Sequence, residues 1–138
     1  MDTRLNGTVS TLRIAIGLMA TLAGLDKFFN LLTNWAAYIA PVAQQLLPFS
    51  TTTFMAIVGV IEFAVGVTIL VIRPSLGAFV ASGWLVLVAT NLVLGGHFDL
   101  AVRDVVLAVA AYGLGRLEQL RTEAPAAVPA GRPRVVTA

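Results

Sequence analysis

The chain has 138 residues, a length that permits one domain. Hydrophobic residues make up 58% of it and charged residues only 12%, about half of the roughly 25% charged residues of soluble domains. There are no cysteines, which excludes disulfides, thiolate metal ligands and a cysteine nucleophile, and the small net charge of +2 forms no basic patch for nucleic acid.

Four apolar segments predict four transmembrane helices, because a spanning helix needs about 20 mostly apolar residues. The first runs from about Ser10 to Leu32 and the second from about Thr52 to Ile72. The third occupies about 75–95, and the fourth runs from about Asp99 to Leu117. Segment 34–48 has two prolines and no charge, and we expect it to be interfacial or re-entrant, with a fifth span as the alternative.

The expected fold is therefore all-α, an integral membrane four-helix bundle over residues 1–118. Residues 119–138 are rich in Pro, Ala and Arg and predict a disordered cytoplasmic tail. The positive-inside rule favours an N-in/C-in topology in the cell (plasma) membrane. That topology leaves only Lys27 and Arg103 outside and puts seven arginines inside: Arg4, Arg13, Arg73, Arg116, Arg121, Arg132 and Arg134.

Six ionisable residues gather near the expected outer ends of the first and last helices. An exposed charge inside a membrane costs at least about 2.5–3.5 kcal/mol, so these groups are expected to face the bundle interior and to pair. Asp99 and Arg103 are four residues apart and can pair along one helix. The shared charges also suggest that the first and last helices are neighbours. The six residues are Asp26, Lys27, His97, Asp99, Arg103 and Asp104.

Small residues indicate the faces on which the helices pack, because they let backbones approach closely. In the first helix Gly17 and Gly24 share a side with Lys27, and in the second Gly59 and Gly66 share one with Glu62. The last helix carries a stripe that consists of Asp104, Ala108, Ala111 and Gly115.

Glu62 lies near the middle of its span, where an ionised side chain is most costly. Beyond the reach of a cation it would be protonated, because burial disfavours the charged form. It is a candidate proton-relay or ligand-contact residue; the alternative is a hydrogen bond across the glycine seam. Trp35, Tyr38 and Trp84 are expected to be interfacial anchors.

Three stretches resemble the DoxX-like family of small four-helix integral membrane proteins. RIAIGLMATLAGLDKFFN is similar to that family's opening helix, with an Arg, a Gly, and a second Gly before a charged and aromatic cluster. VGVIEFAVGVTILV is similar to its second helix, with a Glu between two glycines seven residues apart. FDLAVRDVVLAVAAYGLGRL is similar to its last helix, and the resemblance covers about residues 10–118.

The resemblance implies a redox-associated membrane subunit that binds quinone or another lipid, since the name-giving relatives resemble a subunit of a thiosulfate:quinone oxidoreductase. It leaves open whether the chain is an enzyme. No intrinsic cofactor or metal is expected, and quinone is the cofactor implied. The expected partners are membrane lipid and either a larger membrane complex or further copies of the chain. The candidate ligand-binding residues are expected to form a polar pocket near the outer leaflet, and the alternative is interhelical ion pairing that only fixes the register of the helices. These residues are Asp26, Lys27, Glu62, Asp99, Arg103 and Asp104.

Two other functions are compatible with this sequence. One is a noncatalytic accessory or anchoring subunit of a larger membrane complex. The other is a small transporter, which would have to be an oligomer because the chain is short and its halves carry no obvious inverted repeat.

Overall fold

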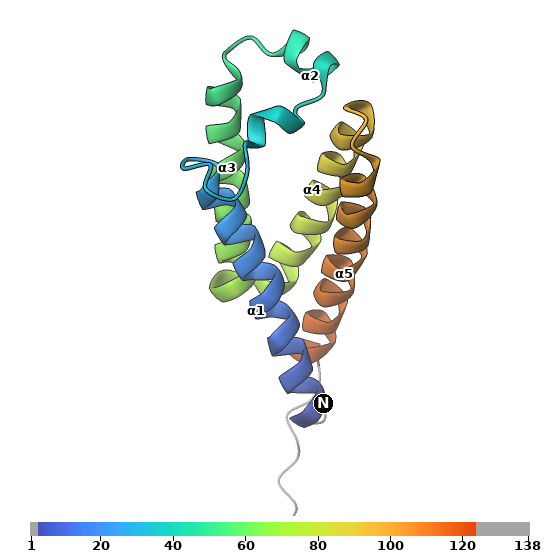
Figure 1. Ribbon diagram of the computed structural model, residues 1–138. Coiled ribbons are helices and arrows are strands. Elements are labelled where there is room, and N and C mark those ends of the chain that lie inside the picture. The colour runs from blue at the N-terminus through green and yellow to red at the C-terminus, as the bar shows by residue number, and fades with distance from the viewer. Residues whose placement is uncertain (1–2, 124–138) are drawn as a thin grey trace, which may run out of the picture.

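The computed structural model describes residues 3–123, and this part of the chain is built from helices with no strand (Figure 1). Its long helices are α1 (Thr3–Asp26), α3 (Thr51–Val67), α4 (Pro74–Leu94) and α5 (Phe98–Glu123). A π-helical turn, η2 (Thr68–Ile72), continues α3.

Three of these helices are long and apolar enough to cross a membrane. They are α1 from Leu5, α3 together with η2, and α4. The second and third predicted helices are thus confirmed to within a residue at each end. The fourth long helix, α5, carries seven charged side chains, although the stretch 105–115 within it has none.

The first predicted helix ends six residues too late, because α1 stops at Asp26 rather than Leu32. The Asp26 carboxylate accepts hydrogen bonds from the backbone N–H groups of Leu31 and Leu32, at 2.9 and 3.0 Å. Asn30 has a φ of 51°, a left-handed conformation that asparagine tolerates better than most residues. The chain therefore turns back at Asp26, although the apolar pattern continues through Leu32.

The last predicted helix ends too early, because α5 continues to Glu123 instead of stopping at Leu117. Residues 119–123 are thus helical, where the sequence predicted a disordered tail. The rest of the predicted tail, 124–138, lies outside the described residues.

The segment between α1 and α3 contains a short 3-10 helix, η1 (Trp35–Tyr38), and a six-residue helix, α2 (Pro41–Leu46). Six residues of α-helix span only about 9 Å, so the alternative of a fifth span is wrong. The segment is attached to α4: Asn91 Nδ2 donates to the Tyr38 carbonyl at 2.7 Å, and Ala40 N donates to Asn91 Oδ1 at 3.0 Å.

The long helices form two pairs, α1 with α3 and α4 with α5, which converge at the end that carries the N-terminus (Figure 1). Glycines make the first pair close, since a Cβ on Gly24 would lie 2.5 Å from Phe63 N and 2.7 Å from Gly59 O. The second pair is joined by Ser82 Oγ, which donates to the Ala108 carbonyl at 2.8 Å. The small-residue faces predicted for the first two helices, and the buried stripe of α5, are confirmed.

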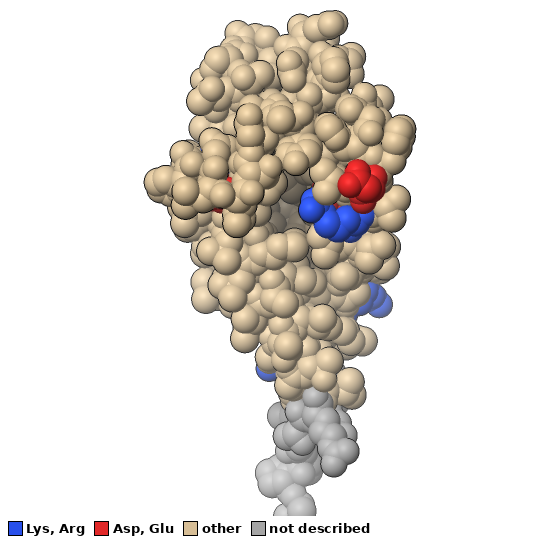
Figure 2. Space-filling model, in the orientation of Figure 1, with Lys and Arg blue, Asp and Glu red and all other residues tan. Residues whose placement is uncertain are grey.

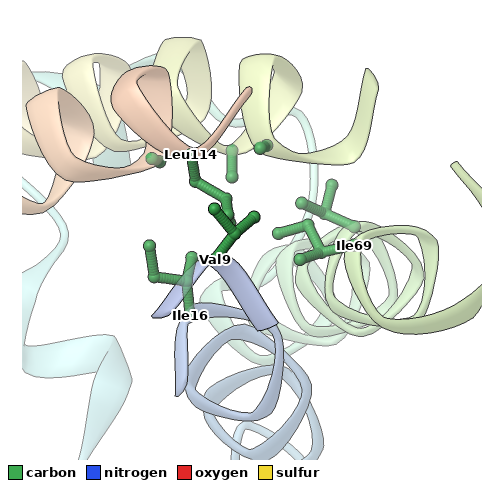
Figure 3. Close-up of a cluster of buried hydrophobic side chains, with 8 residues drawn as sticks. Val9, Ile16, Ile69 and Leu114 are labelled. Carbon is green, nitrogen blue, oxygen red and sulfur yellow. The ribbon is translucent and has the colours of Figure 1, made fainter. Parts of the chain in front are cut away.

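The first and last helices are not the close neighbours that the sequence predicted. They meet at the converging end, where Val9 of α1 and Leu114 of α5 are fully buried in a cluster with Ile69 (Figure 3). Over the rest of its length α1 packs on α3, because the glycine seam of those two helices permits the closer backbone approach.

The glycine contact between α1 and α3 yields a direct prediction. We expect Gly24→Ala to lower the midpoint of thermal unfolding in detergent, because the added methyl group would overlap backbone atoms of α3. Gly83→Ala on α4 is the matched control, since nothing lies within 4 Å of its Cβ position and alanine favours a helix over glycine by up to about 1 kcal/mol. Equal midpoints for the two variants would contradict this close packing.

Candidate functional site

An ion pair between α1 and α3 is the centre of the candidate site. Lys27 directly follows α1, and its Nζ lies 2.5 Å from Glu62 Oε2. Both side chains are sheltered, with 5% of Lys27 and 14% of Glu62 exposed. The other carboxylate oxygen, Glu62 Oε1, accepts a hydrogen bond from Trp84 Nε1 of α4 at 3.1 Å. The pair is therefore bonded to a third helix as well.

Trp35 of η1 connects this ion pair to Asp26. The Lys27 ammonium lies 3.9 Å from the centre of the Trp35 ring, close enough for a cation–π interaction. The same indole donates from Nε1 to Asp26 Oδ2 at 2.8 Å. Asp26 thus holds the chain reversal and the tryptophan together, and the tryptophan covers the lysine.

These groups lie halfway along the bundle. Glu62 is the twelfth of the 22 residues of α3 and η2, and Trp84 is the eleventh of the 21 residues of α4. Figure 1 shows α1 ending partway along α3, with the segment that holds η1 and α2 continuing beyond it. Asp26 and Lys27 lie at the end of the first helix, as predicted. Their expected position near the outer end of the bundle is wrong, because α1 is shifted along α3 toward the converging end.

A second pair lies on α5 at a similar height. Arg103 Nε and Nη2 each lie 2.9 Å from Asp104 Oδ1. Asp104 is one helical turn from Ala108, which is bonded to Ser82, two residues from Trp84. The carboxylate is 5% exposed and the guanidinium side chain 57% exposed. Arg103 therefore extends outward from a buried anion.

Figure 2 shows basic and acidic side chains together over the upper half of α5, beside a hollow in the face between the two helix pairs. The charged residues of that half of α5 are Asp99, Arg103 and Asp104. Uncharged residues make up nearly all the rest of this face. Apart from the acidic side chains beside it, the exposed guanidinium is therefore surrounded mostly by uncharged residues.

The structure brings five of the six predicted site residues into two groups and leaves the sixth apart. Lys27 and Glu62 are paired, with Asp26 joined to them through a tryptophan, and Arg103 is paired with Asp104. Asp99 is exposed at the start of α5, and the predicted pair along the helix is wrong because Arg103 bonds to its adjacent aspartate instead. The expectation that the charged groups pair inside the bundle is confirmed for Lys27, which meets Glu62 of another helix.

Glu62 was expected to be protonated only if no cation lay within reach. That condition is not met, because Lys27 is a cation in direct contact.

The two tryptophans also differ from the prediction of interfacial anchors. Trp35 and Trp84 each donate an indole N–H to a sheltered carboxylate. The sequence itself argues against an interfacial position for Trp84, because this residue lies in the middle of its predicted span rather than near an end.

Sequence reasoning also missed Glu118, a fourth sheltered carboxylate. Only 6% of its side chain is exposed, and it lies between Arg13 of α1 and Arg121 of α5, at 3.9 and 3.6 Å. The predicted helix ended at Leu117, so Glu118 was placed outside it and was not considered. A helix extended by one turn would have put Glu118 on the same face as Ala111 and Gly115.

The chemistry that these side chains offer is hydrogen bonding and ion pairing. Within residues 3–123, His, Asp and Glu side chains form no group of three that could hold a metal ion. The exposed donors of Arg103 can bind a carbonyl or phosphate oxygen, and its paired carboxylate holds it in place.

Comparison of the chain with known protein families, with curated proteins and with solved structures found no match.

The Lys27–Glu62 pair can be tested by a double-mutant cycle. We expect Lys27→Met and Glu62→Gln each to lower the free energy of unfolding, because each leaves a sheltered polar group without its partner. The double variant should lose less than the sum, with a coupling energy of about 0.5–3 kcal/mol. Reversible unfolding in detergent measures this, with exposed Asp99→Asn as the control. Strictly additive losses would show that the two residues are not coupled.

Proposed function

We propose that the chain is a DoxX-like, multi-pass protein of the cell membrane that binds a quinone or a similar polar lipid headgroup between its two helix pairs. In this proposal α5 is the fourth span. Its uncharged stretch 105–115 packs along α4, with Ser82 and Ser75 of α4 donating to carbonyls of Ala108 and Gly115. Packing of this stretch along a spanning neighbour supports α5 as the fourth span, because the stretch would then lie in the same layer as α4.

An N-in/C-in topology is part of the proposal. Arg13, Arg73, Arg116 and Arg121 lie at the converging end of the bundle or at the α3–α4 turn. Lys27 and Arg103, the two remaining cations of the described side chains, are each paired with a carboxylate farther along. The unpaired excess of arginine at one end favours the cytoplasmic side for that end.

The observation that carries the binding proposal is the Arg103–Asp104 pair. Its anion is buried, its cation is 57% exposed, and a hollow lies between the helix pairs on this face (Figure 2). A charged side chain at this depth is costly unless it has a function or a partner. Burial of Asp104 and exposure of Arg103 together leave guanidinium donors available to an incoming ligand.

Quinone fits these residues because its two carbonyl oxygens accept hydrogen bonds. Arg103 would donate to one of them, and Asp104 would hold the guanidinium in position. A bound quinone supplies electron and proton transfer that this chain's side chains lack. The electrons would come from a partner protein, so the proposal includes a redox-associated membrane complex.

A noncatalytic accessory subunit is the second candidate, and one observation favours it. The Lys27–Glu62–Trp84 network satisfies its own members, and Asp26 accepts from Leu31, Leu32 and Trp35. Such a closed network is sufficient to fix the register of α1 on α3 without any ligand. In this case the chain would anchor or stabilise a larger complex through its apolar faces.

The proposed topology can be tested directly, because the chain has no native cysteine. We introduce one cysteine at Thr122 near the end of α5, or at Thr52 near the start of α3; both positions are exposed. A maleimide that cannot cross membranes should label Thr52→Cys in intact cells and Thr122→Cys only after lysis. The reverse pattern would contradict the N-in/C-in assignment, and labelling of both in intact cells would contradict α5 as a span.

The ligand can be identified by mass spectrometry of protein purified in mild detergent. We expect quinone in stoichiometric amounts with the wild type and a loss of about tenfold or more in Arg103→Gln, because charge-assisted hydrogen bonds contribute about 1.5–3 kcal/mol. Arg116→Gln is the control, since Arg116 is exposed and bonded only to Gln119 of its own helix. Quinone absent from the wild type, together with a fixed protein partner, would favour the accessory role instead.

A further inference from the structure

The converging end of the bundle holds a second charged cluster, separate from the proposed quinone site. It consists of Arg13 from α1 and of Glu118 and Arg121 from α5. Arg121 Nη1 also donates to Ser10 Oγ of α1 at 3.3 Å. Two guanidinium groups thus share one carboxylate, and the cluster has one net positive charge.

The N–H donors of the two arginines are not all hydrogen-bonded within the protein. The contacts to Glu118 are 3.9 and 3.6 Å long, beyond the roughly 2.7–3.2 Å of an N–H···O hydrogen bond. Among the described side chains, Arg13 Nε and Glu118 Oε1 are two of the buried polar atoms that lack a hydrogen-bond partner, and the third, Asn6 Oδ1, lies on the same part of α1. An acceptor oxygen of a ligand would satisfy only Arg13 Nε, because Glu118 Oε1 and Asn6 Oδ1 are themselves acceptors.

In the proposed topology the cluster lies at the depth of the lipid phosphates. A Cβ on Gly17 would touch Leu70 of η2, and Ser75 Oγ at the start of α4 bonds to the Gly115 carbonyl. The α3–α4 turn is therefore level with Gly17 and Gly115. Arg13 and Glu118 lie about one helical turn, or roughly 5.4 Å, beyond that level, just past the end of the apolar α3 and α4.

The two arginines are accessible from the surface at this depth. Arg13 and Arg121 are 29% and 32% exposed, whereas the carboxylate between them is 6% exposed. A ligand approaching from the membrane surface therefore meets guanidinium groups and not the acid. Guanidinium groups bind phosphate with paired, charge-assisted hydrogen bonds, and basic pockets between membrane helices bind anionic headgroups.

We propose that Arg13 and Arg121 bind the phosphate of an anionic phospholipid headgroup between α1 and α5. The bound lipid joins the first helix pair to the second at the end where they converge. One phosphodiester charge neutralises the one net positive charge of the cluster. This site is independent of quinone binding, and it depends only on the position of the cluster at a membrane surface.

The test uses the full-length protein in detergent with added phosphatidylglycerol or phosphatidylcholine. Native mass spectrometry counts lipid adducts, and thermal unfolding measures stabilisation. We expect one phosphatidylglycerol per chain, a raised unfolding midpoint, and neither effect with phosphatidylcholine. In Arg121→Gln the affinity for phosphatidylglycerol should fall about tenfold, the loss of one charge-assisted contact.

Control variants separate this site from general charge effects. Arg116→Gln removes an exposed arginine of the same helix, and this variant should keep full phosphatidylglycerol binding. Glu118→Gln should bind phosphatidylglycerol more tightly, because it removes the competing anion. Adduct ratios are taken on folded protein only, so they remain informative if a variant is less stable.

Three results would overturn the proposal. The first is equal binding of phosphatidylglycerol and phosphatidylcholine. The second is an equal loss of binding in the Arg121 and Arg116 variants, which would indicate a diffuse charge effect. The third is full stabilisation by inorganic phosphate alone, which would assign the cluster to free phosphate instead of a lipid.

Discussion

The ion pair between Lys27 and Glu62 is the constraint on which the rest of this structure depends. A lysine halfway along a set of apolar helices is tolerated only where an opposite charge lies close and other side chains shield the ammonium group. Glu62 supplies the charge, Trp84 occupies the second carboxylate oxygen, and Trp35 covers the ammonium. The glycine seam lets α1 approach α3 closely enough for this contact, since Lys27 Cβ would lie 3.1 Å from a Cβ on Gly59.

Because Lys27 is fixed at that height, α1 ends halfway along its partner and the chain must fill the remaining length without a long helix. Non-helical backbone at membrane depth needs partners for its polar groups. Here Asp26 binds the first turn of the returning chain, and Asn91 of α4 binds the backbone at Tyr38 and Ala40. The same shift moves the N-terminal part of α1 beyond the α3–α4 turn, where Arg13 meets Glu118 of α5. Both charged clusters thus follow from one helix register.

The sequence predicted much of this fold, for identifiable reasons. The spans Thr51–Ile72 and Pro74–Leu94 have clear ends, since Arg73 and Pro74 separate them, and the faces carrying Gly24 and Gly59 follow from helical spacing. The end of α1 was not predictable from hydropathy, because the apolar pattern continues past Asp26 and only a side-chain cap stops the helix. The sequence did not predict which helices pack together. The charges shared by the first and last helices suggested that α1 lies beside α5, but glycines allow a closer backbone contact between α1 and α3. Of the candidate site, Lys27, Glu62, Arg103 and Asp104 were found from the cost of intramembrane charge. The mid-span depth of Glu62 was predicted as well, but the depth of the other three was not.

Lys27 is the one lysine in the sequence, so isotope labelling of lysine Nζ marks a single atom. The most direct measurement is the dipolar coupling between that nitrogen and the side-chain carboxyl carbons of labelled glutamate, by solid-state NMR of the protein in lipid bilayers. The sheltered ion pair predicts a strong coupling that characterises direct contact and that disappears in Glu62→Gln. A lysine signal with no coupling to any glutamate carboxyl would contradict the account, because Lys27 would then be solvated or paired elsewhere and α1 would have no fixed register on α3.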